Sequence, residues 1–158
     1  MFHIKFDNKG QTIIEATIAL ASIMLTLAAI SIAITTSVSN SQFIKNQTLA
    51  SKYAQSAMEY MSYLRNTDPT TFEARTGIYC MNGDNSLDTG SCPTVNLANT
   101  FKREVDFSQD ATSDCGGGTE VTVSVYWSSG KCGSVNTFCH KSQLISCFSN
   151  ESGSGTTL

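Results

Sequence analysis

The side chains best suited to chemistry are cysteines, and all of them lie in the second half of the 158-residue chain. An even number of cysteines in a small domain is typical of a disulfide framework formed in an oxidising compartment, with reduced or metal-binding thiols as the alternative. Sequence alone does not choose among the pairings. The simplest hypothesis joins neighbours along the chain, and its pairs are Cys80–Cys92, Cys115–Cys132 and Cys139–Cys147.

Metal and catalytic sites find little support in the same region. His140 stands among Cys132, Cys139 and Cys147, but their spacing does not match the short Cys-x-x-Cys knuckles of structural zinc sites. The acids near Asp84 lack the alternating spacing of a calcium loop. No acid is placed to orient His140 for nucleophilic catalysis. We therefore expect no metal, no cofactor and no enzymatic activity.

One carboxylate stands out at the other end of the chain. Glu15 lies at the head of a long apolar run, in the stretch "NKGQTIIEATIALA" from Asn8 to Ala21. A charged group at the edge of a membrane-length segment costs several kcal/mol unless something pairs with it. The position of Glu15 therefore needs a functional explanation.

The apolar run itself is long enough to cross a membrane. No charged residue occurs from Ala16 to Ser39, and the part from Ala16 to Ile34 is interrupted only by Thr and Ser. About 20 apolar residues span the hydrocarbon core as a helix, and hydroxyls can bond back to carbonyls of their own helix. Lys5 and Lys9 precede the run, so the positive-inside rule keeps the N-terminus cytoplasmic and exports the cysteine-rich half.

Three explanations compete for this segment. A secretory signal peptide has a shorter apolar region followed by its cleavage site, whereas here a helical pattern continues past the run. A plain single-pass anchor fits the hydrophobicity but gives no reason for Glu15. The third explanation is a signal that is cut before the apolar run.

That third explanation rests on the motif "KGQTIIEATIAL", which resembles the class III signal of type IV pilins and pseudopilins. The resemblance makes Gly10 the last leader residue, Gln11 the first mature residue and Glu15 the fifth. It implies that a prepilin peptidase cuts after Gly10 on the cytoplasmic side and N-methylates the new amine, although most members carry Phe where this chain has Gln11. It also implies that Glu15 pairs with the N-terminal amine of a neighbouring subunit in a filament.

The positions after the apolar run keep a helical period up to a stop signal. Apolar residues recur at steps of three and four, while Lys45, Lys52 and Glu59 fall on another face. The sequence contains no Gly or Pro from Gln11 to Asp68, and Asp68-Pro69 ends a helix. The sequence therefore predicts one helix from Thr12 to Asn66. The apolar positions of its outer half are Phe43, Leu49 or Ala50, Tyr53 or Ala54, Ala57, Met61 and Leu64.

The rest of the chain has β-type alternation. Strands are predicted at Phe101–Phe107, with Arg103 as an unusual inward member, at Thr119–Trp127 and at Lys141–Phe148. The region Thr71–Asn99 is predicted to be irregular, with a loop at Met81–Gly90. The fold class expected is α+β: a long N-terminal helix, membrane-spanning in its first half, packed on a small antiparallel sheet with disulfides. The order of these elements also resembles minor pilins of the pilus-modification kind.

Together these observations predict a non-enzymatic filament subunit, a minor pilin or pseudopilin. The expected partners are other pilin subunits, the prepilin peptidase, the pilus assembly platform and membrane lipid. A net charge of −3 argues against nucleic acid. The subunit is expected in the cytoplasmic membrane with its N-terminus inside, and then in a surface filament. The alternatives are a single-pass anchored adhesin and a type II secretion pseudopilin.

The expected division of the chain has five parts. They are a leader at 1–10, a transmembrane and filament-core helix at 11–38, an amphipathic helix at 39–67, a disulfide-bearing head at 68–148 and a flexible tail at 149–158.

Overall fold

A computed structural model describes residues 11–109 and 115–149 of the chain, with the backbone alone at Gln11. The expected leader, including Gly10, and nearly all of the expected tail lie outside the described residues. The chain divides into two compact units, one ending at Phe43 and the other beginning at Ile44. Its fold class is α+β, as the sequence predicted.

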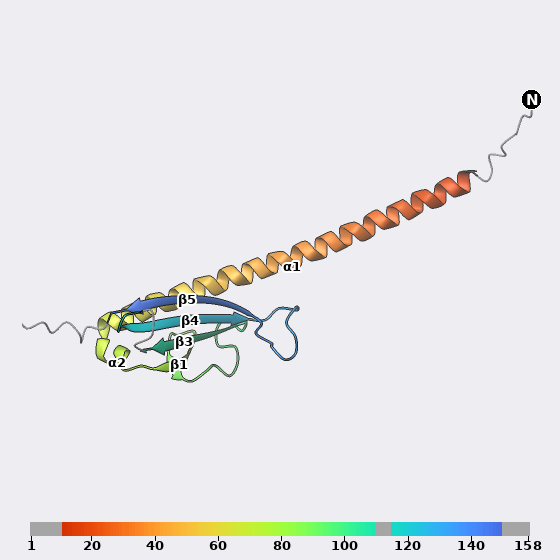
Figure 1. Ribbon diagram of the computed structural model, residues 1–158. Helices are drawn as coiled ribbons and strands as arrows, with labels where there is room; N and C mark the ends of the chain where they lie inside the picture. Colours follow the sequence, from red (N-terminus) through yellow and green to blue (C-terminus); the bar gives the residue numbers. More distant parts are fainter. Residues whose placement is uncertain (1–10, 110–114, 150–158) are drawn as a thin grey trace, which may run out of the picture. The chain divides into compact units, whose positions relative to one another are not determined.

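The described part contains two helices and five strands (Figure 1). Their bounds are α1 Gln11–Thr67, α2 Pro69–Glu73, β1 Gly77–Met81, β2 Leu87–Thr89, β3 Phe101–Ser108, β4 Thr119–Trp127 and β5 His140–Phe148. The long helix and the last three strands therefore lie within a residue or so of their predicted ends.

α1 is a helix of 57 residues because nothing in its sequence interrupts it. Such a helix is about 85 Å long at 1.5 Å per residue. It ends where Pro69 removes a backbone donor and restricts Asp68 before it. Asp68 then caps α2, since its Oδ1 accepts from the Thr71 backbone N–H at 3.2 Å and from the Thr70 hydroxyl at 3.0 Å.

The strands form one antiparallel sheet in the order β2-β1-β3-β4-β5. β3 and β4 occupy central positions, and Val105 lies opposite Val123 in their register. Strict alternation along both strands directs their apolar side chains to one face. Arg103 shares that buried face, as predicted.

The core of the second unit lies between that sheet face and one face of α1. The α1 residues in it are Ala50, Ala54, Ala57, Met58 and Met61. They recur at helical spacing, and the small alanines let the helix approach the sheet closely. Trp127, Phe101 and Phe107 fill the space opposite. The predicted apolar positions are confirmed here except for Phe43, which lies in the first unit with 37 % of its surface exposed.

The prediction of an irregular Thr71–Asn99 was wrong up to Thr89, whereas its residues after Thr89 belong to none of the helices and strands. This region contains the end of α2 and the β1–β2 hairpin, whose register places Tyr79 opposite Thr89 and Met81 opposite Leu87. The predicted loop at Met81–Gly90 is therefore mostly strand and tight turn, with Asn85 at φ 66° in the left-handed region that Asn tolerates. Both strands are short, and neither alternates cleanly, so their local signal was weak.

The cap of α2 makes stability depend on pH in the acidic range. Hydrogen bonds from Thr71 and Thr70 lower the pKa of Asp68 below its usual value of 3.8. A carboxyl whose pKa is depressed by folding adds stability above its unfolded pKa and loses it as the pH falls through the folded one. We expect the urea concentration at the unfolding midpoint to decrease as the pH is lowered from about 5 to about 2. The decrease should be smaller in Asp68→Asn, because Asn also caps a helix but does not titrate. An unchanged pH dependence in that variant would contradict this role.

Candidate functional site

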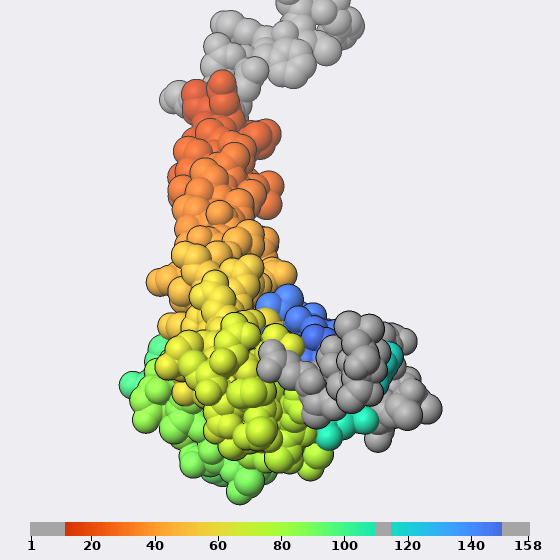
Figure 2. Space-filling view, turned by 90° about the vertical axis from the view of Figure 1, so that its left-hand side faces the viewer, coloured from red at the N-terminus to blue at the C-terminus, as the bar shows by residue number. Residues whose placement is uncertain are grey.

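The first unit presents an apolar helical surface with one carboxylate near its start. Every large apolar side chain from Ile13 to Val38 is more than half exposed. Figure 2 shows the side chains of this part of α1 in red and orange. α1 is the one described helix long and apolar enough to cross a membrane. A membrane or other protein subunits would remove this surface from water.

The four hydroxyls of the apolar run from Ala16 to Ile34 are satisfied within the helix, as predicted. Thr17, Ser22 and Thr26 each donate to the carbonyl oxygen three residues earlier at 2.8 Å, and Ser31 donates to Leu27 at 2.9 Å. These bonds remove the polar cost of the hydroxyls in an apolar environment. Glu15 differs from these hydroxyls because it carries a charge and has no such bond within the described part of the helix.

Glu15 has an exposed side chain in the first turns of α1. Among the described residues, nothing forms an ion pair or hydrogen bond with its carboxylate. Gln11, where α1 begins, lies one turn earlier, on the same side of the helix as Glu15. The arrangement can attract a cation at the start of the helix. The peptide bond expected to be cut, Gly10–Gln11, includes a residue outside the described part.

All six cysteines form disulfides, but two predicted pairings were wrong. Cys80–Cys92 is confirmed, whereas the other bonds are Cys115–Cys147 and Cys132–Cys139. The reason is the antiparallel pairing of β4 with β5, which places Thr119 opposite Phe148 and Trp127 opposite His140. One end of the hairpin therefore holds Cys115 and Cys147, while the connection at the other end holds the remaining pair.

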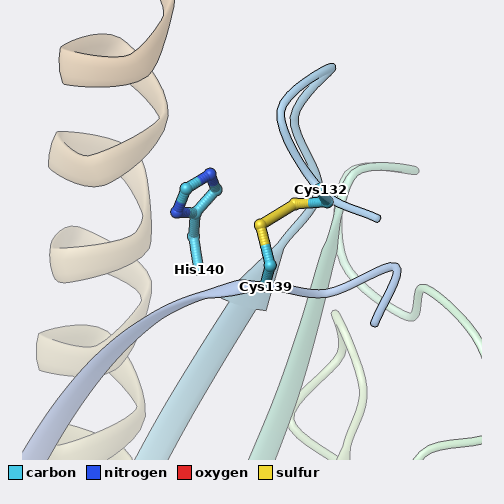
Figure 3. Close-up of side chains that lie close together, drawn as sticks. All are labelled: Cys132, Cys139 and His140. Carbon is cyan, nitrogen blue, oxygen red and sulfur yellow. A yellow bond between two sulfur atoms is a disulfide. The ribbon is translucent and has the colours of Figure 1, made fainter. Parts of the chain in front are cut away.

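The connection between β4 and β5 brings two sulfurs and an imidazole together (Figure 3). The ligand atoms of Cys132, Cys139 and His140 all lie within 4.8 Å of one another. However, zinc binds thiolates, and both sulfurs here are shared in the disulfide. His140 has other neighbours as well: its Nε2 lies 2.9 Å from the Ser129 hydroxyl, and its ring stacks on Trp127. In the oxidised form this cluster stabilises the connection.

A polar network holds the segment after β2 against the sheet. The Asn96 side-chain amide donates to the Met81 carbonyl at 2.8 Å, and its oxygen accepts from the Arg103 backbone N–H at 2.9 Å. Cys92 Sγ lies 3.1 Å from the Arg103 carbonyl oxygen. The first disulfide therefore attaches the segment after β2 to β1, and Asn96 attaches it to both β1 and β3. The role of Asn96 could not be predicted from the sequence, because a lone Asn in a loop carries no pattern.

In comparisons with known proteins, no family model, curated protein or solved structure matches the chain.

Proposed function

We propose that the protein is a structural subunit, a minor pilin or pseudopilin, of a type IV pilus-like filament. The observation that carries the proposal is the lone Glu15 carboxylate in an exposed apolar helix, one turn after the residue that would become the new N-terminus. Cleavage at Gly10–Gln11 would create an ammonium group beside this carboxylate. An amine and a carboxylate attract strongly in a low-dielectric setting, and either alone is costly there.

The rest of the chain agrees with export of the second unit. Its three disulfides need an oxidising compartment. The lysines before the apolar segment favour a cytoplasmic N-terminus. The subunit would wait in the cytoplasmic membrane as a single-pass protein and then enter the filament through α1, with its apolar surface covered by neighbouring subunits. Its partners would be those subunits, the prepilin peptidase and the assembly platform.

The test is the mass of the mature N-terminus. Full-length protein is expressed with an active prepilin peptidase, and the N-terminal peptide is sequenced by mass spectrometry. We expect Gln11 to come first, with or without a methyl group on its amine. A Gly10→Val variant and a host with inactive peptidase serve as matched controls, and in both cases residues 1–10 should be retained. An intact leader on the wild-type chain beside an active peptidase would overturn the proposal in favour of a plain anchored protein.

A further inference from the structure

The sheet of the second unit has a hollow on the face opposite its core. It measures about 200 Å³ and is built from the outward side chains of adjacent strands. The strands β3, β4 and β5, which carry most of these side chains, lie side by side (Figure 1). Its polar lining is Asp106 of β3, Thr122, Ser124 and Tyr126 of β4, and Lys141 and Gln143 of β5. These residues carry no functional pattern in the sequence, because the hollow exists only through the register of the strands.

The register holds the lining groups in fixed positions. Asp106 lies opposite Thr122, Ser124 opposite Gln143, and Tyr126 opposite Lys141. β3 and β4 both have neighbours on each side, so their backbones cannot shift independently. Side chains carried by paired strands form a more precise binding site than side chains carried by loops.

The hollow holds hydrogen-bonding groups that the protein itself does not use. Ser124 is only 8 % exposed, yet its hydroxyl has no hydrogen-bond partner among the described residues. The same holds for the Thr122 hydroxyl and the Gln143 amide within the described part of the chain. The Ser124 hydroxyl opens into the hollow, where water or a ligand can serve as its hydrogen-bond partner.

The charges around the hollow balance. Glu104 also lines it, but its Oε1 accepts from the Cys92 backbone N–H at 2.9 Å and lies 3.0 Å from Lys102 Nζ. The remaining charged groups are one acid, Asp106, and one base, Lys141. The surroundings therefore favour neither an anion nor a cation. Hydroxyl, amide and carboxylate groups together suit a neutral ligand with many hydroxyls.

We propose that this hollow binds a neutral sugar unit, such as a terminal residue of a glycan. Pockets for drug-sized ligands measure about 300–1,000 Å³, so this smaller hollow suits a single ring. The sugar hydroxyls would bond to Ser124, Thr122 and Gln143, while Asp106 accepts from a further hydroxyl. This activity belongs to the second unit and does not depend on the proposed filament function.

The test uses purified full-length protein in a detergent whose head group is not a sugar, because maltosides and glucosides would compete. The probes are neutral methyl glycosides, followed by an array of neutral and acidic glycans, with binding measured by saturation-transfer difference NMR. We expect at least one neutral glycoside to bind. Ser124→Ala and Thr122→Val should each weaken its affinity about three- to tenfold, since each removes one hydroxyl.

Ser108→Ala is the matched control. It removes a hydroxyl from the same face of β3 but outside the hollow, and it should leave affinity unchanged. All three variants should keep the wild-type unfolding midpoint, so a lost signal cannot be attributed to misfolding. The proposal is overturned if no neutral glycoside binds, if only acidic glycans bind, or if the two hollow variants bind as tightly as wild type. None of these results would bear on cleavage at Gly10.

Discussion

Replacing Glu15 by Gln should leave the chain in the membrane and keep it out of filaments. The substitution preserves the size of the side chain and removes only its charge. Insertion should not suffer, because a neutral amide costs less than a carboxylate in an apolar environment. Filament entry should fail because the new ammonium group at Gln11 would then lack its counter-ion inside the assembly.

The size of this effect follows from the cost of an unpaired charge. Removing one partner of a buried ion pair typically costs about 3–5 kcal/mol. The share of chains found in sheared filaments should therefore fall at least about tenfold. The measurement compares membrane and filament fractions by immunoblot in cells that contain the assembly machinery.

Glu59→Gln provides the matched control for this experiment. It is the same chemical change on the same helix, at a side chain that is exposed in the second unit. This variant should enter filaments as the wild type does. If Glu15→Gln enters filaments equally well, the pairing between carboxylate and amine is wrong. If Glu15→Gln fails to insert in the membrane, Glu15 is needed for insertion, which precedes the assembly step that the proposal assigns to it.

The sequence predicted the elements that carry a strong local pattern. α1 could be predicted because nothing between Gln11 and Asp68 interrupts a helix, and β3 and β4 could be predicted because their side chains alternate cleanly. Capping signals for α2 were also present in Asp68 and Pro69. The same two residues end α1 and begin the next helix, and the sequence alone predicts only the first of these roles.

Features that depend on the pairing of distant segments could not be predicted in the same way. β1 is a strand because it pairs with β3, which follows it by about twenty residues. The disulfide Cys115–Cys147 follows from the pairing of β4 with β5, and both strands had been predicted. Combining that pairing with the cysteine positions would have given the observed bonds. The candidate site at Glu15, by contrast, lies within one helical segment, so it stays a prediction that no tertiary contact of the described residues bears on.

Arg103 shows how a residue can be placed correctly while its role stays hidden. Its inward position followed from the alternation of β3, and it is 2 % exposed. No described carboxylate pairs with it. Instead its guanidinium donates to the Asn82 carbonyl at 2.6 Å, to Asn85 Oδ1 at 3.2 Å and to the carbonyls of Met81 and Tyr53 at 3.4 Å. Burial lowers the pKa of Arg103.

Arg103 therefore joins three parts of the second unit: β3, the β1–β2 hairpin and α1. We expect Arg103→Ala to lower the free energy of unfolding by about 3–5 kcal/mol, since it leaves a cavity and removes the donors to several carbonyls. Arg103→Met fills most of the space but restores no donor, and it should cost about 1–3 kcal/mol. The difference between the two variants separates packing from hydrogen bonding.

Urea unfolding of the full-length protein in detergent measures both values. Trp127 is the single tryptophan and is buried in the core, so its fluorescence reports on the second unit. Arg75→Ala is the matched control: Arg75 is half-buried and its guanidinium lies 5.7 Å from the centre of the Tyr79 ring. It should cost about 1 kcal/mol or less. If Arg103→Met is as stable as wild type, the hydrogen bonds from the guanidinium to the carbonyls do not stabilise the fold. Arg103 then contributes only through the volume that its side chain fills.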